Sequence, residues 1–150
     1  MIRRVKQEDK NGCGIACVAM VTGKTYTQAK RYFEESVFLP KDKKPHTRHY
    51  QLRRALENFG IITEKRPFRH WRSIEINAIV PINRRRDGGW HWVVLVPNGV
   101  RHYILDPAPR KGRRRYDFRG IKARGFYIAI LGHFRESIRA VDREQVRRKF

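Results

Sequence analysis

The stretch that decides the fold is Gln7 to Val21, Gln-Glu-Asp-Lys-Asn-Gly-Cys-Gly-Ile-Ala-Cys-Val-Ala-Met-Val. It is polar at first and apolar beyond Cys13, so we expect a helix with Asn11 or Gly12 as its N-cap. From Ile15 onward this helix has no polar side, which is typical of a buried central helix. Cys13 would lie in its first turn, where unpaired N–H groups and the helix dipole favour a thiolate. The stretch therefore predicts a nucleophile at the start of a buried helix.

Length and charge set the outer limits of the interpretation. A chain of 150 residues predicts a single domain, 1–150, with a core of about 7–132 and a charged C-terminal helix or tail over 133–150. Lys and Arg number 35 against 14 Asp and Glu, a formal net charge of +21. Such a charge favours an acidic partner, which could be nucleic acid, an immunity protein or an anionic surface. The oligomeric state stays open.

The sequence also gives expectations about the cellular compartment of the protein. No apolar run reaches the length of a membrane span, and no apolar segment follows the basic N-terminus as in a secretory signal. We therefore expect a cytoplasmic protein, with delivery into another cell left open. Cys13 and Cys17 are four residues apart on one helix, a poor arrangement for a disulfide, so a reducing compartment is favoured.

The spacing of apolar residues predicts three helices followed by strands. The second helix runs from about Thr25 to Glu35, and the third is capped by Thr47 and stopped at Gly60. We expect strands at 61–65, 77–82, 91–96, 101–105 and 126–131, and exposed loops at 39–46, 84–89 and 110–115. Helices first and an antiparallel sheet second predict an α+β fold.

A hairpin places two further polar residues. Asn98-Gly99 between two apolar runs favours a two-residue turn. Counting outward from that turn sets His91 directly opposite Asp106, and directly opposed side chains lie about 5 Å apart at Cβ. The carboxylate would then accept the proton of His91 Nδ1 and leave Nε2 for a nucleophile.

Cys13, His91 and Asp106 together have the composition of a thiol hydrolase triad. The thiolate attacks a carbonyl, the imidazolium protonates the leaving amine and the carboxylate orients the ring. Gln7 is the candidate donor for the oxyanion. We expect a stand-alone cysteine peptidase that acts on a peptide or protein and uses no cofactor or metal.

These residues resemble a known family. Gln7, six residues before Cys13, and the run Cys-Gly-Ile-Ala-Cys-Val-Ala-Met-Val are similar to the start of the C39-like (bacteriocin-processing, double-glycine) peptidase domain. The segments His91-Trp-Val-Val-Leu and Ile-Leu-Asp106-Pro, and the strand from Gly125, are similar to its later motifs. The resemblance implies a papain-like cysteine protease fold, with helices carrying the Cys and a sheet carrying His and Asp. It also implies that Gln7 builds the oxyanion hole and that the substrate is a leader peptide cut after a double glycine.

Three other interpretations remain. The same triad serves deamidation or acyl transfer, because it can act on any amide. A basic papain-like effector or toxin, bacterial in origin, could act on or bind nucleic acid through the loops 84–86 and 110–115. A metal site from Cys13, Cys17, His46 and His49 is the weakest of the three, because structural zinc sites use closer Cys spacing.

Overall fold

The protein is described from a computed structural model that covers residues 2–36, 47–83, 89–99, 101–109 and 114–133. Its helical elements are α1 (Cys13–Thr22), α2 (Tyr26–Ser36), α3 (His49–Asn58) and the short 3₁₀ helix η1 (Trp71–Ser73). Its strands are β1 (Ile61–Pro67), β2 (Ala78–Ile82), β3 (His91–Val96), β4 (Tyr103–Leu105), β5 (Arg114–Arg115) and β6 (Phe126–His133).

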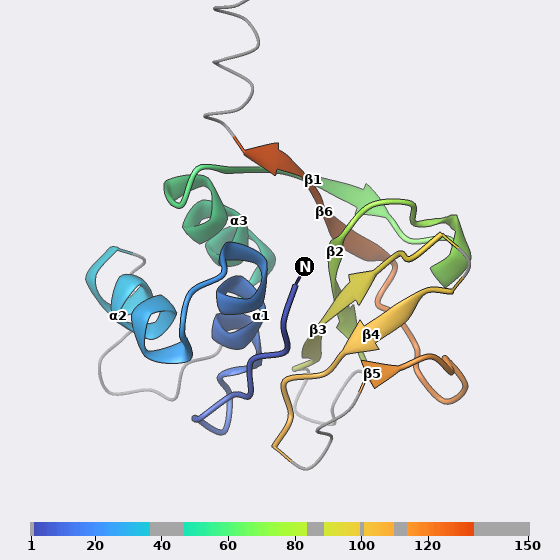
Figure 1. Cartoon of the computed structure of the whole chain (residues 1–150), viewed down its shortest axis with the longest axis horizontal. Helices are drawn as coiled ribbons and strands as arrows, with labels where there is room; N and C mark the ends of the chain where they lie inside the picture. The colour runs from blue at the N-terminus through green and yellow to red at the C-terminus, as the bar shows by residue number, and fades with distance from the viewer. Residues whose placement is uncertain (1, 37–46, 84–88, 100, 110–113, 134–150) are drawn as a thin grey trace, which may run out of the picture.

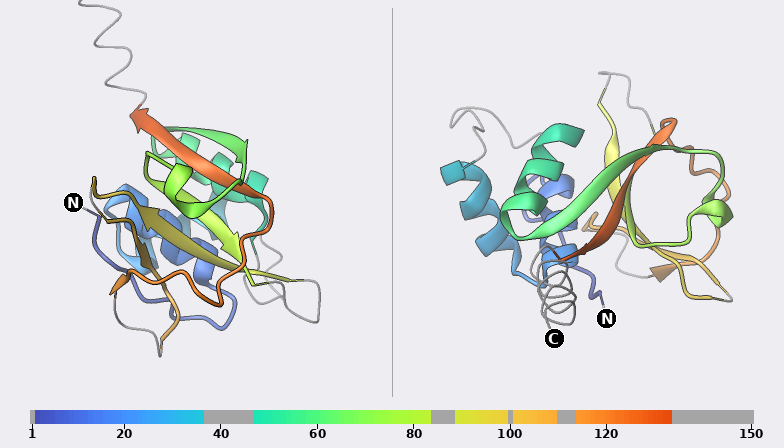
Figure 2. Two further views of the ribbon diagram at one scale, coloured as in Figure 1. Left: turned by 90° about the vertical axis from the view of Figure 1, so that its right-hand side faces the viewer. Right: turned by 90° about the horizontal axis from the view of Figure 1, so that it is seen from above.

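The strands form one antiparallel sheet with the order β1-β6-β2-β3-β4-β5. The helices α1, α2 and α3 lie together on one side of this sheet, as the ribbon views show (Figure 1; Figure 2). This arrangement is the predicted α+β fold, with a helical part packed on an antiparallel sheet.

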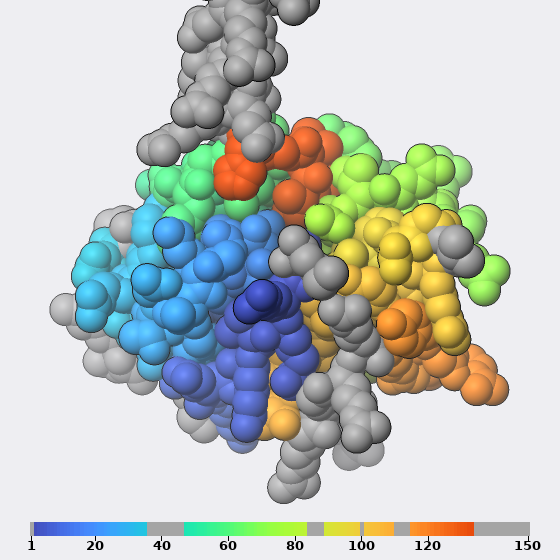
Figure 3. All heavy atoms as spheres, viewed as in Figure 1, coloured from blue at the N-terminus to red at the C-terminus, as the bar shows by residue number. Residues whose placement is uncertain are grey.

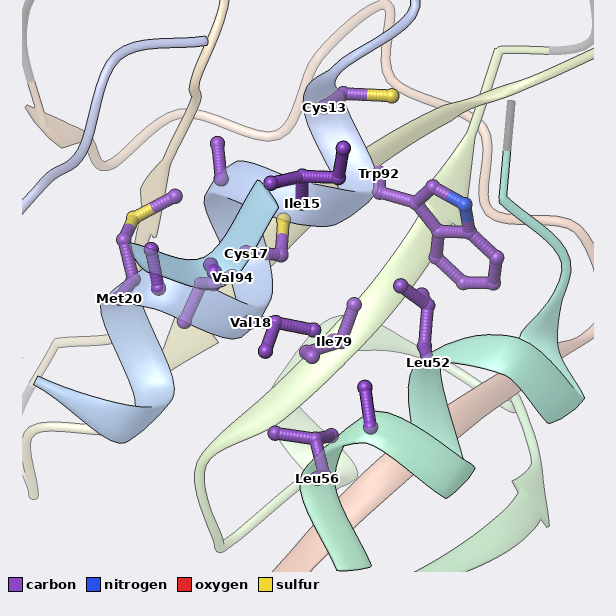
Figure 4. Packing of buried hydrophobic residues seen from close by; sticks show 14 of the residues in the cluster. Cys13, Ile15, Cys17, Val18, Met20, Leu52, Leu56, Ile79, Trp92 and Val94 are labelled. Carbon is purple, nitrogen blue, oxygen red and sulfur yellow. The ribbon is translucent and has the colours of Figure 1, made fainter. Parts of the chain in front are cut away.

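Helix α1 is the centre of the core. Every residue from Cys13 to Met20 is buried, which confirms the prediction from its all-apolar sequence. Its side chains pack against Leu52 and Leu56 of α3 and against the sheet through Ile79 and Trp92 (Figure 4). Each fully buried aliphatic side chain of this kind stabilises the fold by about 1.5–3 kcal/mol.

Close packing at α1 requires glycine at position 14. A Cβ on Gly14 would lie 1.8 Å from Thr47 Oγ1, and Thr47 itself is 1% exposed. The Thr47 carbonyl accepts a hydrogen bond of 3.0 Å from Trp92 Nε1, and this bond holds the Thr47 segment in place against Gly14. Thr47 was predicted to cap α3, and this is wrong: Arg48 is the N-cap, and its N–H donates to Gln51 Oε1 at 2.7 Å. Thr47 is held in the core instead.

We expect Gly14→Ala to destabilise the protein by roughly 1–3 kcal/mol, because the new methyl overpacks a site with no free volume. In an exposed helix the same change would stabilise by up to about 1 kcal/mol, so the sign alone is informative. Urea denaturation measures the effect. The double variant Gly14→Ala/Thr47→Ala removes the clashing hydroxyl and should recover part of the loss; no recovery would contradict the packing explanation.

The β3–β4 hairpin differs from its predicted register. The pairs are Val94 with Leu105, Leu95 with Ile104 and Val96 with Tyr103, a shift of two residues from a two-residue turn at Asn98-Gly99. The connection is longer, and the Arg101 N–H donates to the Asn98 carbonyl at 3.0 Å. His91 therefore lies diagonal to Asp106 and not directly opposite it. A shift of two keeps both residues on the same face of the sheet.

The other face of the sheet has its own apolar cluster. Val80, Val93, Leu95 and Ile104 are covered there by the segments 68–77 and 116–125, which contribute Ile74 and Ile121 among others. Part of the predicted loop 110–115 is strand β5, which pairs with β4. The predicted loop 39–46, residues 84–88 of the predicted loop 84–89, and residues 134–150 of the predicted C-terminal helix or tail 133–150 lie outside the described residues. None of the described helices has the length and apolar character needed to cross a bilayer.

Candidate active site

Cys13 is the first residue of α1, and its thiol is directed away from the packed interior. Figure 4 shows its sulfur at the edge of the cluster, whereas Cys17 lies within it. Gly12 is the N-cap and supplies no side chain, while its carbonyl accepts the Ala16 N–H at 3.0 Å. No side chain therefore caps the N–H groups at the start of α1, where the Cys13 thiol lies. Burial raises the pKa of Cys17 well above its usual value, so that thiol stays protonated. Both cysteines are free.

The loop before Cys13 is fixed to α2 through Asp9. Tyr26 donates a 2.7 Å hydrogen bond to Asp9, and Lys30 forms a 3.0 Å ion pair with the same carboxylate. The Asp9 carbonyl accepts the Gly12 N–H at 3.0 Å. A Cβ on Gly12 would stand 1.9 Å from the Tyr26 hydroxyl, so glycine is required there. The sequence did not indicate this clamp, because an isolated Asp and Tyr seventeen residues apart carry no motif.

His91 and Asp106 meet at one end of the sheet. His91 opens β3, Asp106 follows the end of β4, and His91 Nε2 lies 2.7 Å from Asp106 Oδ1. The same Oδ1 accepts the Ala108 N–H at 2.9 Å, which fixes the carboxylate. The expectation that Nδ1 would contact Asp106 is wrong. Because Asp106 lies diagonal to His91, the far nitrogen of the ring reaches it, and Nδ1 is the nitrogen left for Cys13.

The charge of His91 follows from these contacts. Burial by itself lowers the pKa of the imidazole, but hydrogen bonds to Asp106 and Cys13 outweigh it and raise the pKa to about 9. Only 14% of each side chain of the His91–Asp106 pair is exposed, so solvent screens the interaction weakly. The ring is therefore an imidazolium at neutral pH, next to a thiol at a helix N-terminus.

The N-terminal segment crosses this site and holds the turn that carries Asp106. Arg4 donates from Nε to the Asp106 carbonyl and from Nη2 to the Ala108 carbonyl, both at 2.7 Å. The Gln7 N–H donates to the Pro107 carbonyl at 2.9 Å. In the space-filling view this dark-blue segment lies at the surface between the helices and the yellow strands (Figure 3). Arg4 could not be recognised from the sequence, because its partners are main-chain carbonyls more than a hundred residues away.

The side chain of Gln7 is buried against the loop that leads into Cys13. It is 6% exposed, and Nε2 donates to the carbonyls of Asp9 and Lys10, each at 3.0 Å. Among the described residues, Gln7 Oε1 is buried without a hydrogen-bond partner. Gln7 is therefore held against the loop before Cys13, with its amide nitrogen donating to two carbonyls of that loop.

The raised pKa of His91 predicts a pH dependence of stability. A raised folded-state pKa stabilises the fold fully below the unfolded value of about 6.5, and this contribution is lost as pH rises through about 9. We expect a loss of up to about 3 kcal/mol across that window. Urea unfolding near pH 6 and near pH 9.5, compared between wild type and His91→Gln, isolates the effect. Equal losses in both proteins would contradict the assignment.

The competing metal site has little support in the described part of the chain. No group of three or more His, Cys, Asp or Glu side chains there is arranged to hold a metal ion. Cys17 is fully buried and lies in the apolar core, and His46 is outside the described residues. His49 packs edge-on against Phe126, with ring centroids 5.6 Å apart, and burial lowers the pKa of its imidazole.

The fold is that of the double-glycine peptidase domains. The structure superposes on a double glycine motif protease from an AMS/PCAT transporter in complex with its leader peptide, with a TM-score of 0.60 and 18% identity over 87% of this chain and 91% of that one. It superposes on the peptidase domain of Streptococcus mutans ComA with a TM-score of 0.59 and 20% identity, over 85% of this chain and 97% of that one. No protein-family model and no curated protein sequence matches the chain.

Proposed function

We propose that this protein is a cysteine peptidase that hydrolyses a peptide bond with Cys13 as nucleophile, His91 as acid and base, and Asp106 as the group that orients His91. The observation that carries the proposal is the 2.7 Å contact of His91 Nε2 with Asp106 Oδ1 beside a cysteine that begins a buried helix. The similarity in fold to peptidase domains is a separate support.

The proposed reaction has two steps, formation and hydrolysis of a thioester. The Cys13 thiolate attacks the peptide carbonyl carbon, and the electron pair of the carbonyl moves to oxygen. The imidazolium of His91 then donates its Nδ1 proton to the leaving nitrogen, which departs as an amine and leaves a thioester. Neutral His91 takes a proton from water, the hydroxide attacks the thioester, and Cys13 leaves as a thiolate. The Asp106 carboxylate stabilises the imidazolium in each step in which His91 carries the additional proton.

The oxyanion requires hydrogen-bond donors, and two are available. The Cys13 N–H is at the first position of α1, where no helical carbonyl can accept it. Gln7 is the second donor in this proposal, because its buried amide lies against the loop before Cys13. One of its two protons must turn from a loop carbonyl to the substrate oxygen. A donor of this kind contributes about 10²–10³ in turnover.

The substrate class proposed is a peptide with a double glycine before the cleaved bond, as the name of one structural neighbour suggests. The same chemistry on a glutamine side chain would release ammonia and cut no chain. Proteomic profiling of new N-termini, in cells that express wild type or Cys13→Ala, tests both points. New N-termini that follow Gly-Gly only with wild type support the proposal. If no new N-termini appear and a Gln of a target protein is converted to Glu, the protein is a deamidase and not a peptidase.

A further inference from the structure

We propose a second binding site, at the end of the sheet away from Cys13, that takes single-stranded nucleic acid through its phosphates and a stacked base. A pocket of about 390 Å³ opens there, beside the tip of the β3–β4 hairpin. Its lining residues come from three segments of the chain and are Arg72, Gly99, Arg101, His102, Tyr116 and Phe118. The pocket thus combines two guanidinium groups and an imidazole with two aromatic rings.

The cations in this pocket are positioned by the fold. Arg72 belongs to η1 and Arg101 to the hairpin tip, so two guanidinium groups distant in sequence line one hollow. His102 Nε2 donates to the Ile74 carbonyl at 2.7 Å, which fixes the ring in the wall of the pocket. No lining residue is acidic, and the neighbouring Asp117 is paired with Arg119 at 2.8 Å. A phosphate would therefore meet cations without an opposing carboxylate.

The aromatic side of the pocket suits a planar base. The Arg101 guanidinium lies 4.6 Å from the centroid of the Tyr116 ring, and Tyr116 remains 40% exposed. Phe118 is held by a stacked contact with Trp71, with ring centroids 5.0 Å apart and an angle of 15° between the planes. Bases of single strands stack on exposed aromatic rings and guanidinium planes, and each stacked base contributes about 1–3 kcal/mol. An acidic peptide offers carboxylates but no such plane.

The surface around the pocket favours a polymer over an isolated phosphate. The segments 68–77 and 116–125, which cover the sheet face opposite the helices, are basic. Their charged residues are Arg69, Arg72, Arg119, Lys122 and Arg124, against Glu75 and Asp117. Successive phosphates along a strand would find further cations on this face, since Arg69 lies on the segment of Arg72 and the bridge of Ala123 to Ile82 places Lys122 and Arg124 toward the far end of β2.

The location separates this site from the proposed catalytic groups. His91 begins β3 and the pocket lies beyond the other end of this strand, so a distance on the order of 20 Å lies between them. A strand bound at the pocket leaves Cys13 open to a peptide. Binding and hydrolysis can therefore fail independently.

The test must remove the general attraction of a protein of charge +21. We compare Arg72→Ser/Arg101→Ser with Arg31→Ser/Arg54→Ser, which lowers the charge equally on the exposed faces of α2 and α3. The probe is a fluorescein-labelled oligothymidylate, titrated by anisotropy between about 50 and 200 mM salt. We expect the pocket variant to bind tenfold or more weakly. The slope of log affinity against log salt concentration should become shallower by about 1.4, which is about 0.7 for each of the two phosphate contacts removed. Less than twofold is expected for the helix variant. Equal losses would overturn the proposal.

Tyr116 gives a second test that involves no charge. Tyr116→Ala should weaken oligothymidylate binding about tenfold, while Tyr116→Phe keeps the stacking plane and should bind as wild type. Poly-glutamate of matched charge should compete poorly. Equal binding by Tyr116→Ala and Tyr116→Phe, or competition by poly-glutamate as strong as by unlabelled oligonucleotide, would overturn the nucleic-acid assignment. Cleavage of a peptide substrate should be unchanged in the pocket variants, and binding should be unchanged in Cys13→Ala.

Discussion

Replacing Cys13 by alanine is expected to lower peptide hydrolysis by four to six orders of magnitude and to leave the fold intact. The thiol forms the bond that replaces the peptide bond, and it belongs to the residue that begins α1 and interacts with His91. The loss of stability should be small, because the Cys13 sulfur lies at the edge of the packed cluster (Figure 4). Turnover of a double-glycine peptide and urea unfolding measure the two effects separately.

Cys17→Ala is the matched control. This cysteine lies one turn further along the same helix, is fully buried and has a strongly raised pKa because of burial. Its loss should cost roughly 1 kcal/mol of stability for the small cavity and leave turnover near wild type. Iodoacetamide near pH 6 should label Cys13 in preference to Cys17, as read by mass spectrometry of the peptides. Preferential labelling of Cys17 would remove Cys13 from the mechanism. The same conclusion would follow if Cys17→Ala abolished turnover while Cys13→Ala retained it.

The central helix could be predicted because its signal is local. The apolar run after Cys13 determines both the helix and its burial, and the N-cap is Gly12, one of the two predicted residues. Strands β2, β3 and β6 were predicted for a similar reason, since continuous apolar runs of this length are typical of buried strands.

The hairpin register could not be read from the turn alone. Asn98-Gly99 favours a two-residue connection, but β3 also pairs with β2 along most of its length, from Ile82 with His91 to Ala78 with Leu95. Pairing with β2 and burial of both faces of the sheet fix the position of β3 independently of the turn. The length of the β3–β4 loop then follows from the positions of the two strands. The error of two residues preserved the side on which His91 and Asp106 lie, which is why the pair was still found.

The contacts that hold the site together were the least predictable part. Arg4 binds the carbonyls of Asp106 and Ala108, and Asp9 binds Tyr26 and Lys30. Main-chain carbonyls are present at every residue, so a sequence carries no mark of which one an arginine will reach. Such supports become visible only when the chain is folded.

Replacing Asp106 by asparagine is expected to slow hydrolysis by about 10³–10⁴ without disturbing the fold; a loss near the upper figure is known for the corresponding change in a serine protease triad. In the wild type one atom, Oδ1, accepts both the Ala108 N–H and the His91 Nε2–H. An asparagine Oδ1 can keep both hydrogen bonds, so what is lost is the negative charge. The pKa of His91, about 9 in the wild type, should then fall toward or below the ordinary histidine value, because burial remains while the ion pair is gone.

The pH profile of kcat distinguishes this electrostatic role from a structural one. If Asp106 acts through charge, Asp106→Asn shifts the alkaline limb of the profile to lower pH, while urea unfolding at neutral pH shows a cooperative protein. A lower kcat with an unshifted limb would mean that the substitution only misplaces the ring. Turnover within a factor of about ten of wild type would mean that the 2.7 Å contact has no part in catalysis, and His91 would then have to act on Cys13 alone.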